Sequence, residues 1–430
     1  MENRKTKSER IAMEISQKID EFYDAQEPEE FVPGKSKVPL SYPSYGKEEV
    51  REAMDSILSG WVTMGKKVKL FEELYAKYIG MPSCVMVNSG SSANLLALSV
   101  LASPKLKNHV GRGDEIITPA VTWATSVSPI SQIGAVPHLV DVDLETYNMN
   151  LEQVEKSITK KTKAIMAVHL LGNPCDMKLV MEIAERHGLY VIEDTCESHG
   201  AETSGRKCGS FGDFSTFSFF FAHHISTVEG GAVLTRNEEL NEICRSMRAY
   251  GWIRDMANKE QYMPESRMDE KFTFAYPGYN FRPTDINAAF GIHQIKKIES
   301  FIEKRGKNAE YLAKRLAPYS DFLHLLAIKP GTRCSWFGYP ITLKPNAGFS
   351  RDELRNFLEA RGIETRPIMT GDITRQPMMK HIAYEKENLA TSDYLTANSF
   401  FIGVHQNLPA NALEYVAESF EVFFRGRKKE

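Results

Sequence analysis

The chain has 430 residues, of which 42% are hydrophobic and 25% are charged, and this ordinary composition excludes a disordered chain and a disulfide-rich miniprotein. Its 53 Lys and Arg against 56 Asp and Glu give a net charge of −3, so no nucleic acid is expected as a partner. The longest uncharged stretch, 116–140, is broken by Pro and Gly, and the charged N-terminus has no signal-peptide pattern. We therefore expect a cytoplasmic protein that does not span a membrane. The six cysteines form no CxxC pair, so we expect reduced thiols and no metal site.

Two helices are predicted before the first strand. Apolar residues recur at helical spacing over 11–22, which indicates an amphipathic helix that packs on the body of the protein. A proline-rich linker follows over 27–45, and a second helix is expected to end at Gly60. We assign residues 1–40 to this N-terminal helix and linker.

Seven short β-rich runs then alternate with helix-like segments, and they cover 84–89, 115–120, 137–143, 163–170, 189–195, 214–220 and 231–236. Strands separated by helices predict an α/β fold with a mainly parallel seven-stranded sheet and helices on both faces. We assign 41–290 to this large domain. Long charged helices and a few strands follow, which predict a smaller C-terminal α+β domain over 291–430. Ligands of such sheets bind beyond the carboxyl ends of the strands.

Polar residues follow the first two strands. Gly90, Ser91 and Ser92 open a helix whose N–H groups and dipole suit a phosphate, although a serine-capped helix without a ligand fits the same residues. Trp123 comes just after the second strand, where its indole could stack on a flat ring or lie in the core.

Two carboxylates and two histidines follow the later strands. Asp194 ends the run YVIED, with Glu197 one turn further on; either could hold a protonated ring nitrogen or belong to a structural pair. Ser218 ends the next strand, and His223 and His224 precede the sequence Glu-Gly-Gly. Isolated histidines are more often packing residues than catalysts.

A phosphate cradle, a stacking aromatic residue, a carboxylate for a ring nitrogen and a basic residue before Glu-Gly-Gly, in this order, suit pyridoxal phosphate. With these features the sequence resembles the nucleotide-sugar aminotransferase family, the sugar-modifying branch of the fold-type I pyridoxal phosphate enzymes. The resemblance extends from about Gly34 to the C-terminus. It implies a fold-type I aminotransferase-like architecture and cofactor contacts from the cradle, Trp123, Asp194, Glu197 and Ser218.

The lysine that anchors the cofactor in these aminotransferases is replaced. In the family it lies five residues after the serine and six before the glutamate of Glu-Gly-Gly, and both counts give His223 here. An imidazole forms no stable imine with an aldehyde, so the cofactor would be bound non-covalently. The same substitution is typical of the sugar 3-dehydratases, which use pyridoxamine phosphate to remove the C3 hydroxyl of a 4-keto-6-deoxy sugar nucleotide. His223 is then the implied catalytic base.

Two dehydratase subfamilies share this histidine. One acts on a CDP-linked sugar and carries a [2Fe–2S] cluster, which needs four thiolates, whereas 245–280, where most of its ligands lie, contains no cysteine here. The other acts on GDP-4-keto-6-deoxymannose with L-glutamate as amino donor, and Arg366-Pro367 and the sequence GVHQ near the end resemble it. The N-terminal extension, PITLK and TRQP resemble the CDP type instead. A CDP-type enzyme without its cluster and a catalytically silent homologue stay as alternatives.

Further residues are implied by the resemblance alone. Asn280 in PGYNFRP matches an asparagine that reaches the neighbouring subunit's cofactor phosphate, which implies a homodimer with shared active sites. An acidic residue at Glu197 is again typical of the dehydratases. Four residues are expected substrate contacts, and each could equally be a packing or surface residue: His224, Ser335, Trp336 and Arg366.

Overall fold

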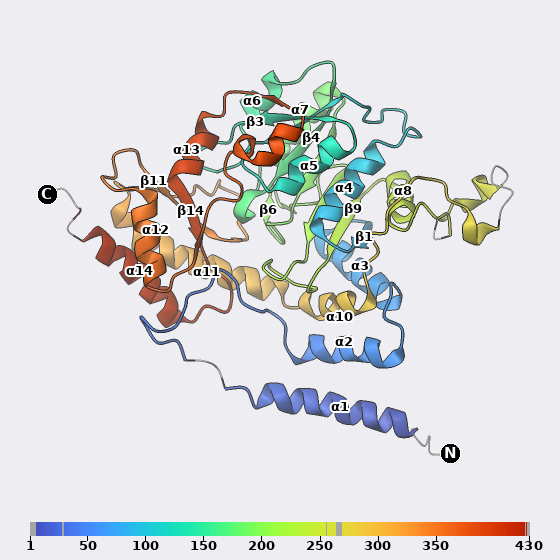
Figure 1. The fold of residues 1–430 in the computed structure, drawn as a ribbon, viewed down its shortest axis with the longest axis horizontal. Coiled ribbons are helices and arrows are strands. Elements are labelled where there is room, and N and C mark those ends of the chain that lie inside the picture. The colour runs from blue at the N-terminus through green and yellow to red at the C-terminus, as the bar shows by residue number, and fades with distance from the viewer. Residues whose placement is uncertain (1–5, 28–29, 255, 264–268, 426, 428–430) are drawn as a thin grey trace.

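A computed structural model describes residues 6–27, 30–254, 256–263, 269–425 and 427, and its centre is one large twisted sheet (Figure 1). In spatial order its strands are β1 (Ser83–Val87), β9 (Gly231–Thr235), β8 (Phe214–Ser218), β5 (Tyr190–Asp194), β4 (Thr162–Val168), β2 (Glu115–Pro119), β3 (Val136–Val140) and β13 (Glu385–Lys386). Only β9 runs antiparallel to its neighbours, β1 and β8. All seven expected strands are present. The two-residue β13 pairs with β3 and makes the sheet eight-stranded rather than seven-stranded.

Helices cover both faces of this sheet because alternate strand residues point to opposite sides. Ile116 and Ile192 pack in a cluster with α4 (Gly90–Leu101) and α8 (Glu238–Arg248). Their neighbours Ile117 and Val191 pack on the other side with α6 (Leu151–Lys156) and α7 (Met177–His187). On that second side α3 (Lys66–Ile79) covers β1, β8 and β9. Buried on both faces, the sheet is a rigid base for the residues at its edge.

The C-terminal part forms its own small sheet and core. Its strands, in order, are β10 (Leu323–His324), β11 (Tyr339–Leu343), β14 (Ser399–Ile402) and β12 (Thr365–Arg366), all antiparallel. Around them lie α11 (Ile298–Leu316), α12 (Arg351–Ala360), α13 (Ala390–Asn398) and α14 (Ala410–Phe424). Helix α5 (Ala124–Gln132) packs on β2, β3 and α4 of the large domain, and α10 (Asp285–Gln294) packs on α2 (Lys47–Ser59) and α3.

Both expected N-terminal helices are found. Helix α1 (Lys7–Asp24) has a capping box between Thr6 and Glu9 and packs along α2 (Lys47–Ser59), yet none of its residues is buried. Helix α2 ends at Gly60, whose φ of 75° is the left-handed conformation that glycine favours. Within the described ranges, no helix combines the length and the apolar character that crossing a membrane requires.

The division into 1–40, 41–290 and 291–430 stays our proposal. Two segments cross the proposed boundaries. Phe31 and Val38 of the linker pack in the C-terminal core, whereas Met379 and Leu389 pack beside β3 against Leu139 of the large domain. The N-terminal linker and the 373–389 segment therefore tie the two lobes together.

Candidate active site

A cavity of about 640 Å³ opens at the carboxyl ends of β2, β4, β5 and β8, between the two sheets. Eight of the residues singled out in the sequence line it: Gly90, Ser91, Trp123, Asp194, Glu197, Ser218, His223 and Arg366. The C-terminal part closes the other side with Phe337, Met369 and Phe401, and the linker adds Leu40 and Ser41. The parallel strands therefore bring together residues that lie far apart in the sequence.

The first turn of α4 forms one wall of the cavity. Ser89 caps the helix, because its Oγ accepts a hydrogen bond from the Ser92 amide at 3.1 Å. A Cβ on Gly90 would lie 2.5 Å from the Cβ of Ser218, so only glycine lets this helix approach the end of β8. Since the first amides of a helix have no intrahelical acceptor, this turn presents N–H groups beside the Ser218 side chain.

Asp194 is held by neutral donors rather than by a cation. Its Oδ2 accepts hydrogen bonds from Asn94 Nδ2 at 3.0 Å and Ser126 Oγ at 2.8 Å, and its Oδ1 accepts one from the Cys196 amide at 3.2 Å. The side chain is 5% exposed and lines the cavity. No ion pair neutralises it among the described residues, so its negative charge is available to a cationic ring nitrogen.

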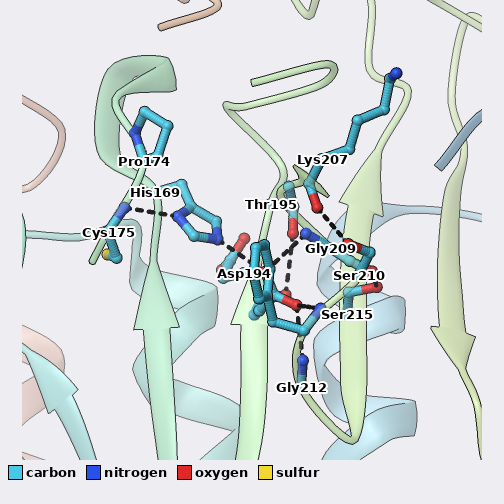
Figure 2. A network of polar contacts seen from close by, with 12 residues as sticks. His169, Pro174, Cys175, Asp194, Thr195, Lys207, Gly209, Ser210, Gly212 and Ser215 are labelled. Atoms are coloured by element: carbon cyan, nitrogen blue, oxygen red, sulfur yellow. Dashed lines mark hydrogen bonds and ion pairs between the residues drawn. The ribbon is translucent and has the colours of Figure 1, made fainter. Parts of the chain in front are cut away.

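The preceding residue, Glu193, anchors the strand from the opposite face. Its carboxylate accepts hydrogen bonds from the amides of Gly209, Phe211 and Gly212 at 2.7–2.9 Å and from His169 Nε2 at 3.2 Å. The Cys175 amide donates to His169 Nδ1, which fixes Nε2 as the protonated nitrogen (Figure 2). This network fixes the end of β5 and the loop that leads into β8.

Glu197 lines the same wall. Its Oε2 accepts a hydrogen bond from the Leu171 amide at 2.8 Å, and Leu171 itself has a φ of 53°. Burial, opposed by that hydrogen bond and reinforced by the charge of Asp194, raises the pKa of Glu197 to about 8. Glu197 therefore carries a proton at neutral pH and can donate a hydrogen bond.

His223 faces the cavity at the position of the missing lysine. Its Nδ1 is buried without a hydrogen-bond partner among the described residues, and its ring lies 5.2 Å from that of Phe337, centroid to centroid. Burial, with smaller contributions from His199 and Arg305, lowers the pKa of His223 to about 3. The imidazole is therefore neutral at physiological pH, as a proton acceptor must be.

A buried tyrosine and a buried histidine fix the backbone at Ser218, five residues before His223. His199 Nε2 donates a hydrogen bond to the Ser218 carbonyl oxygen, and its Nδ1 accepts one from the Tyr75 hydroxyl, both at 2.8 Å. Burial lowers the pKa of His199 to about 4, so this histidine is neutral as well. These two hydrogen bonds fix the backbone of Ser218 at the end of β8.

Trp123 lines the cavity and does not lie in the core, although the sequence left both placements open. It is the N-cap of α5, and 57% of its surface is exposed. Across the cavity, Arg366 is the only Lys or Arg among the lining residues. A flat apolar ring and a cationic head thus occur in one cavity, an arrangement suited to an aromatic ring and a phosphate group.

Five residues named from the sequence do not line the cavity. The Ser92 amide donates the capping hydrogen bond to Ser89 Oγ. His224 is fully buried, and its Nε2 is hydrogen-bonded to the Ser335 carbonyl oxygen at 2.9 Å. Ser335 is buried as well, and Trp336 stacks on Tyr339 away from the cavity. The fifth, Asn280, is exposed, and its Oδ1 accepts a hydrogen bond from Arg282 Nε. On this chain, Arg366 is therefore the one expected substrate contact that reaches the cavity.

Sequence reasoning missed several residues of the site. Asn94 and Ser126 orient Asp194, and Phe337 and Met369 come from the C-terminal part. A signal existed for the first, because Asn94 lies one helical turn after Gly90 and so points to the same side of α4. The residues of the C-terminal part carry no such local signal, since only the arrangement of the two sheets brings them close.

The six cysteines form no disulfide in the structure. All six are free, and the part of the chain that the structure describes contains no cluster of His, Cys, Asp and Glu able to hold a metal ion. Burial raises the pKa of the Cys84 and Cys244 thiols, the second to about 12. Such thiols stay protonated, which is the opposite of what a metal ligand requires.

The fold and the site define a fold-type I aminotransferase-like protein. Its chain belongs to the DegT/DnrJ/EryC1/StrS aminotransferase family, whose model matches residues 43–421. It is 38% identical to the lipopolysaccharide biosynthesis protein RfbH of Salmonella typhimurium, over 96% of this chain and 97% of the relative. It is 40% identical to a GDP-4-keto-6-deoxy-D-mannose 3-dehydratase of Yersinia pseudotuberculosis, over 86% of this chain and 94% of the relative.

A solved structure of similar shape is a GDP-4-keto-6-deoxymannose-3-dehydratase with a trapped PLP–glutamate geminal diamine. It has a TM-score of 0.84 and 36% sequence identity, and the match covers 89% of this chain and 99% of that chain. A further relative is a dTDP-4-dehydro-2,6-dideoxy-D-glucose 3-dehydratase of Saccharopolyspora spinosa, 37% identical over 94% of this chain and 90% of the relative. The identity to dehydratases thus spans both lobes of the fold.

Proposed function

We propose that this protein is a pyridoxamine-phosphate-dependent 3-dehydratase that removes the C3 hydroxyl of a nucleotide-linked 4-keto-6-deoxy sugar, with GDP-4-keto-6-deoxymannose as the preferred candidate. The observation that carries the proposal is His223, a neutral imidazole facing the cavity where the family's aminotransferases have their lysine. Relatives at 37–40% identity that bear the name 3-dehydratase support it.

The residues present fit pyridoxal or pyridoxamine phosphate. The close approach of Gly90 to Ser218 leaves a helix N-terminus and a hydroxyl for a phosphate. Asp194 offers an oriented, unneutralised carboxylate for the pyridine nitrogen, and Trp123 offers a flat face for the ring. Among the described residues no lysine lines the cavity, so the cofactor would be held by these contacts without a covalent bond.

When bound, the cofactor supplies an amino group and an electron sink. Around it, Asp194 keeps the ring nitrogen protonated, and protonated Glu197 donates a hydrogen bond from the inner wall. His223 would accept the proton that is removed beside the reacting amine and pass it to the sugar's C3 hydroxyl, which then leaves as water. Negative charge brought in by the phosphates raises the pKa of His223 toward neutrality, which strengthens it as a base once the cavity is filled.

Substrate recognition is assigned to the cavity mouth. Arg366 supplies the cationic donor for a diphosphate or a carboxylate, and Glu364 and Glu229 lie nearby in the lining. L-Glutamate is the proposed amino donor, and a homodimer is the proposed assembly. Exposed Asn280 would then contact the cofactor phosphate bound to the second copy.

The test is to incubate the protein with GDP- and CDP-linked 4-keto-6-deoxy sugars, pyridoxal phosphate and L-glutamate, and to identify products by mass. A 3-deoxy product from the GDP sugar supports the proposal. Product from the CDP sugar alone would identify the CDP type, and an aminated sugar that keeps its C3 oxygen would indicate an aminotransferase. No product from either sugar would favour a silent homologue.

A further inference from the structure

Arg305 of α11 is a fully buried cation that the proposed chemistry does not use. It is 2% exposed, and no carboxylate of the described residues forms an ion pair with it. Its Nε donates to Gln406 Oε1 at 3.0 Å, and its Nη1 donates to the carbonyl oxygens of Trp336 at 3.0 Å and Phe337 at 3.2 Å. Burying a guanidinium among neutral acceptors is costly, so a specific role is expected.

The carbonyl groups that Arg305 binds belong to residues 335–337, which we name the crossing segment. This segment pairs with 171–172 of the large domain: the Ser335 amide donates to the Gly172 carbonyl at 2.9 Å, and the Phe337 amide donates to the Leu171 carbonyl at 3.0 Å. A Cβ on Gly172 would lie 2.6 Å from the Trp336 nitrogen, so the backbones of these two segments are in direct contact. The crossing segment is therefore a direct contact between the two lobes.

Both sides of this contact hold residues of the cavity. Phe337 packs its ring against that of His223, and the Ser335 carbonyl accepts the hydrogen bond of His224. On the facing segment, the Leu171 amide donates a hydrogen bond to Oε2 of Glu197. Leu171 and Trp336 have φ values of 53° and 55°, which non-glycine residues rarely adopt, so neighbouring groups must keep them in place.

We infer that Arg305 is a positioning residue that fixes the crossing segment and thereby the ring of His223. A guanidinium suits this task because Nη1 reaches two consecutive carbonyl groups while Nε, held in the same rigid plane, reaches the Gln406 amide oxygen, and the single nitrogen of an ammonium group cannot occupy both positions. Gln406, from the sequence GVHQ, accepts the hydrogen bond from Arg305 Nε. Only the expected effect of Arg305 on the reaction rate rests on the proposed function. The contact between Arg305 and the crossing segment exists in the folded protein whatever reaction it catalyses.

The first experiment measures amide hydrogen exchange in the protein without cofactor. Arg305→Gln should speed exchange at the Ser335 and Phe337 amides by about tenfold or more, since their partners Gly172 and Leu171 no longer face a fixed segment. Arg305→Lys keeps the charge but not the fork, and it should show the same change. Unchanged exchange in both variants would overturn the inference, whether or not the protein dehydrates any sugar.

The second experiment measures single-turnover dehydration and cofactor affinity. Arg305→Gln should lower the rate by about tenfold to a hundredfold, because a displacement near 1 Å suffices for such a loss, while the Kd of pyridoxamine phosphate changes less than about twofold. The control is Arg315→Gln, which removes the contact of α11 with Glu421 at 2.9 Å and should leave the rate unchanged. A Kd that rises in parallel with the loss of rate would overturn the inference.

A double-mutant cycle decides whether Arg305 acts through Phe337. Phe337→Leu removes the ring against His223 and leaves the carbonyl contact of Arg305 in place. If the inference is right, the double variant is no slower than the slower single variant, whereas independent sites would multiply their losses. Multiplied losses would overturn it. Should Arg305→Gln fail to fold, Arg305→Lys completes the same cycle. A wild-type protein without dehydratase activity would refute the proposed function and leave the exchange experiment as the test of the contact.

Discussion

Asn94 Nδ2 lies 3.0 Å from Asp194 Oδ2, and this contact joins α4, the proposed phosphate-binding helix, to the strand that carries the proposed ring-nitrogen carboxylate. The same Asn94 accepts a hydrogen bond from Thr216 of β8 through its Oδ1. One amide side chain therefore connects α4, β5 and β8. Because neutral donors orient Asp194, its negative charge is preserved for a ligand.

Asp194→Asn should accordingly impair chemistry far more than folding. We expect the dehydration rate to fall by at least about a hundredfold, since the amide cannot keep a pyridine nitrogen protonated. Asn94→Ala should cause a smaller loss, because the hydrogen bonds from Ser126 and the Cys196 amide remain. Rates are measured in single turnover. The control is Asp393→Asn, an exposed partner of Arg375, and a comparable loss there would contradict the assignment.

His223→Lys should restore a covalent link to pyridoxal phosphate and abolish dehydration. Borohydride reduction followed by peptide mapping should then show a pyridoxyl group at position 223 in the variant and none there in the wild type. His187→Lys, on the exposed end of α7, is the matched control and should stay unlabelled. A label in the wild-type peptide around His223 would refute the non-covalent site.

Glu197→Gln should stabilise the protein increasingly as the pH rises from about 5 to about 8. The folded-state pKa of Glu197, about 8, lies above the ordinary glutamate value of 4.5 that applies in the unfolded chain. Between these values the unfolded chain has lost the proton that the folded chain keeps, so wild-type stability falls as pH rises and levels off above the folded pKa. The variant does not titrate, and its advantage should reach on the order of a few kcal/mol.

Thermal unfolding of both proteins across this pH range measures the difference. Glu152→Gln, on the exposed surface of α6, serves as the control and should give no growing difference. If the difference in unfolding temperature between wild type and Glu197→Gln stayed constant across this pH range, Glu197 would be ionised in the folded state at neutral pH.

The large sheet could be predicted from sequence because each strand carries its own signal. Short β-branched runs such as those of β4 and β5 alternate with helices, and the crossover rule then fixes a parallel arrangement. Strand β13 has only two residues and pairs with β3 from more than two hundred positions away, so no local pattern indicated it. The site followed the same rule. Residues at strand ends, such as Asp194, could be found from the sequence, whereas those from the C-terminal lobe, such as Phe337, could not.

The orientation of the His224 side chain could not be predicted from the sequence either. The sequence places His223 and His224 together before Glu-Gly-Gly, and both are plausible cavity residues. The structure separates them, because the Ser335 carbonyl binds the ring of His224 and turns it inward. A long-range backbone contact thus decides which of two adjacent histidines faces the cavity.

No [2Fe–2S] cluster should form, even after anaerobic treatment with iron and sulfide, and turnover should need no reductase. The six thiols are free and dispersed, and burial raises the pKa of several of them, so they stay protonated. Iron and sulfide analysis together with visible absorbance gives the measurement. Near-stoichiometric iron and sulfide in active protein would instead place it with the reductase-coupled dehydratases.

L-Glutamate should be consumed at about one molecule per sugar, with 2-oxoglutarate and ammonia formed together. Elimination releases the C3 hydroxyl as water, and the sugar leaves with the amino nitrogen at C4, which hydrolysis then frees as ammonia. Each cycle therefore uses one amino group, and an amino acid bound in the same cavity must replace it. His223 would move the proton in both halves, and Arg366 is the cavity's candidate for a carboxylate.

Protein preloaded with pyridoxamine phosphate should consequently stop after about one turnover per site when glutamate is absent, and should resume when it is added. Counting sugar, 2-oxoglutarate and ammonia in the same reaction gives the measurement. Arg366→Gln should weaken the response to glutamate, whereas Arg375→Gln, on the exposed surface beside Asp393, should not. Sustained turnover without any amino donor would show that the amine is not consumed. A route that keeps nitrogen on the cofactor would then have to replace this one, and His223 would lose its second proton transfer.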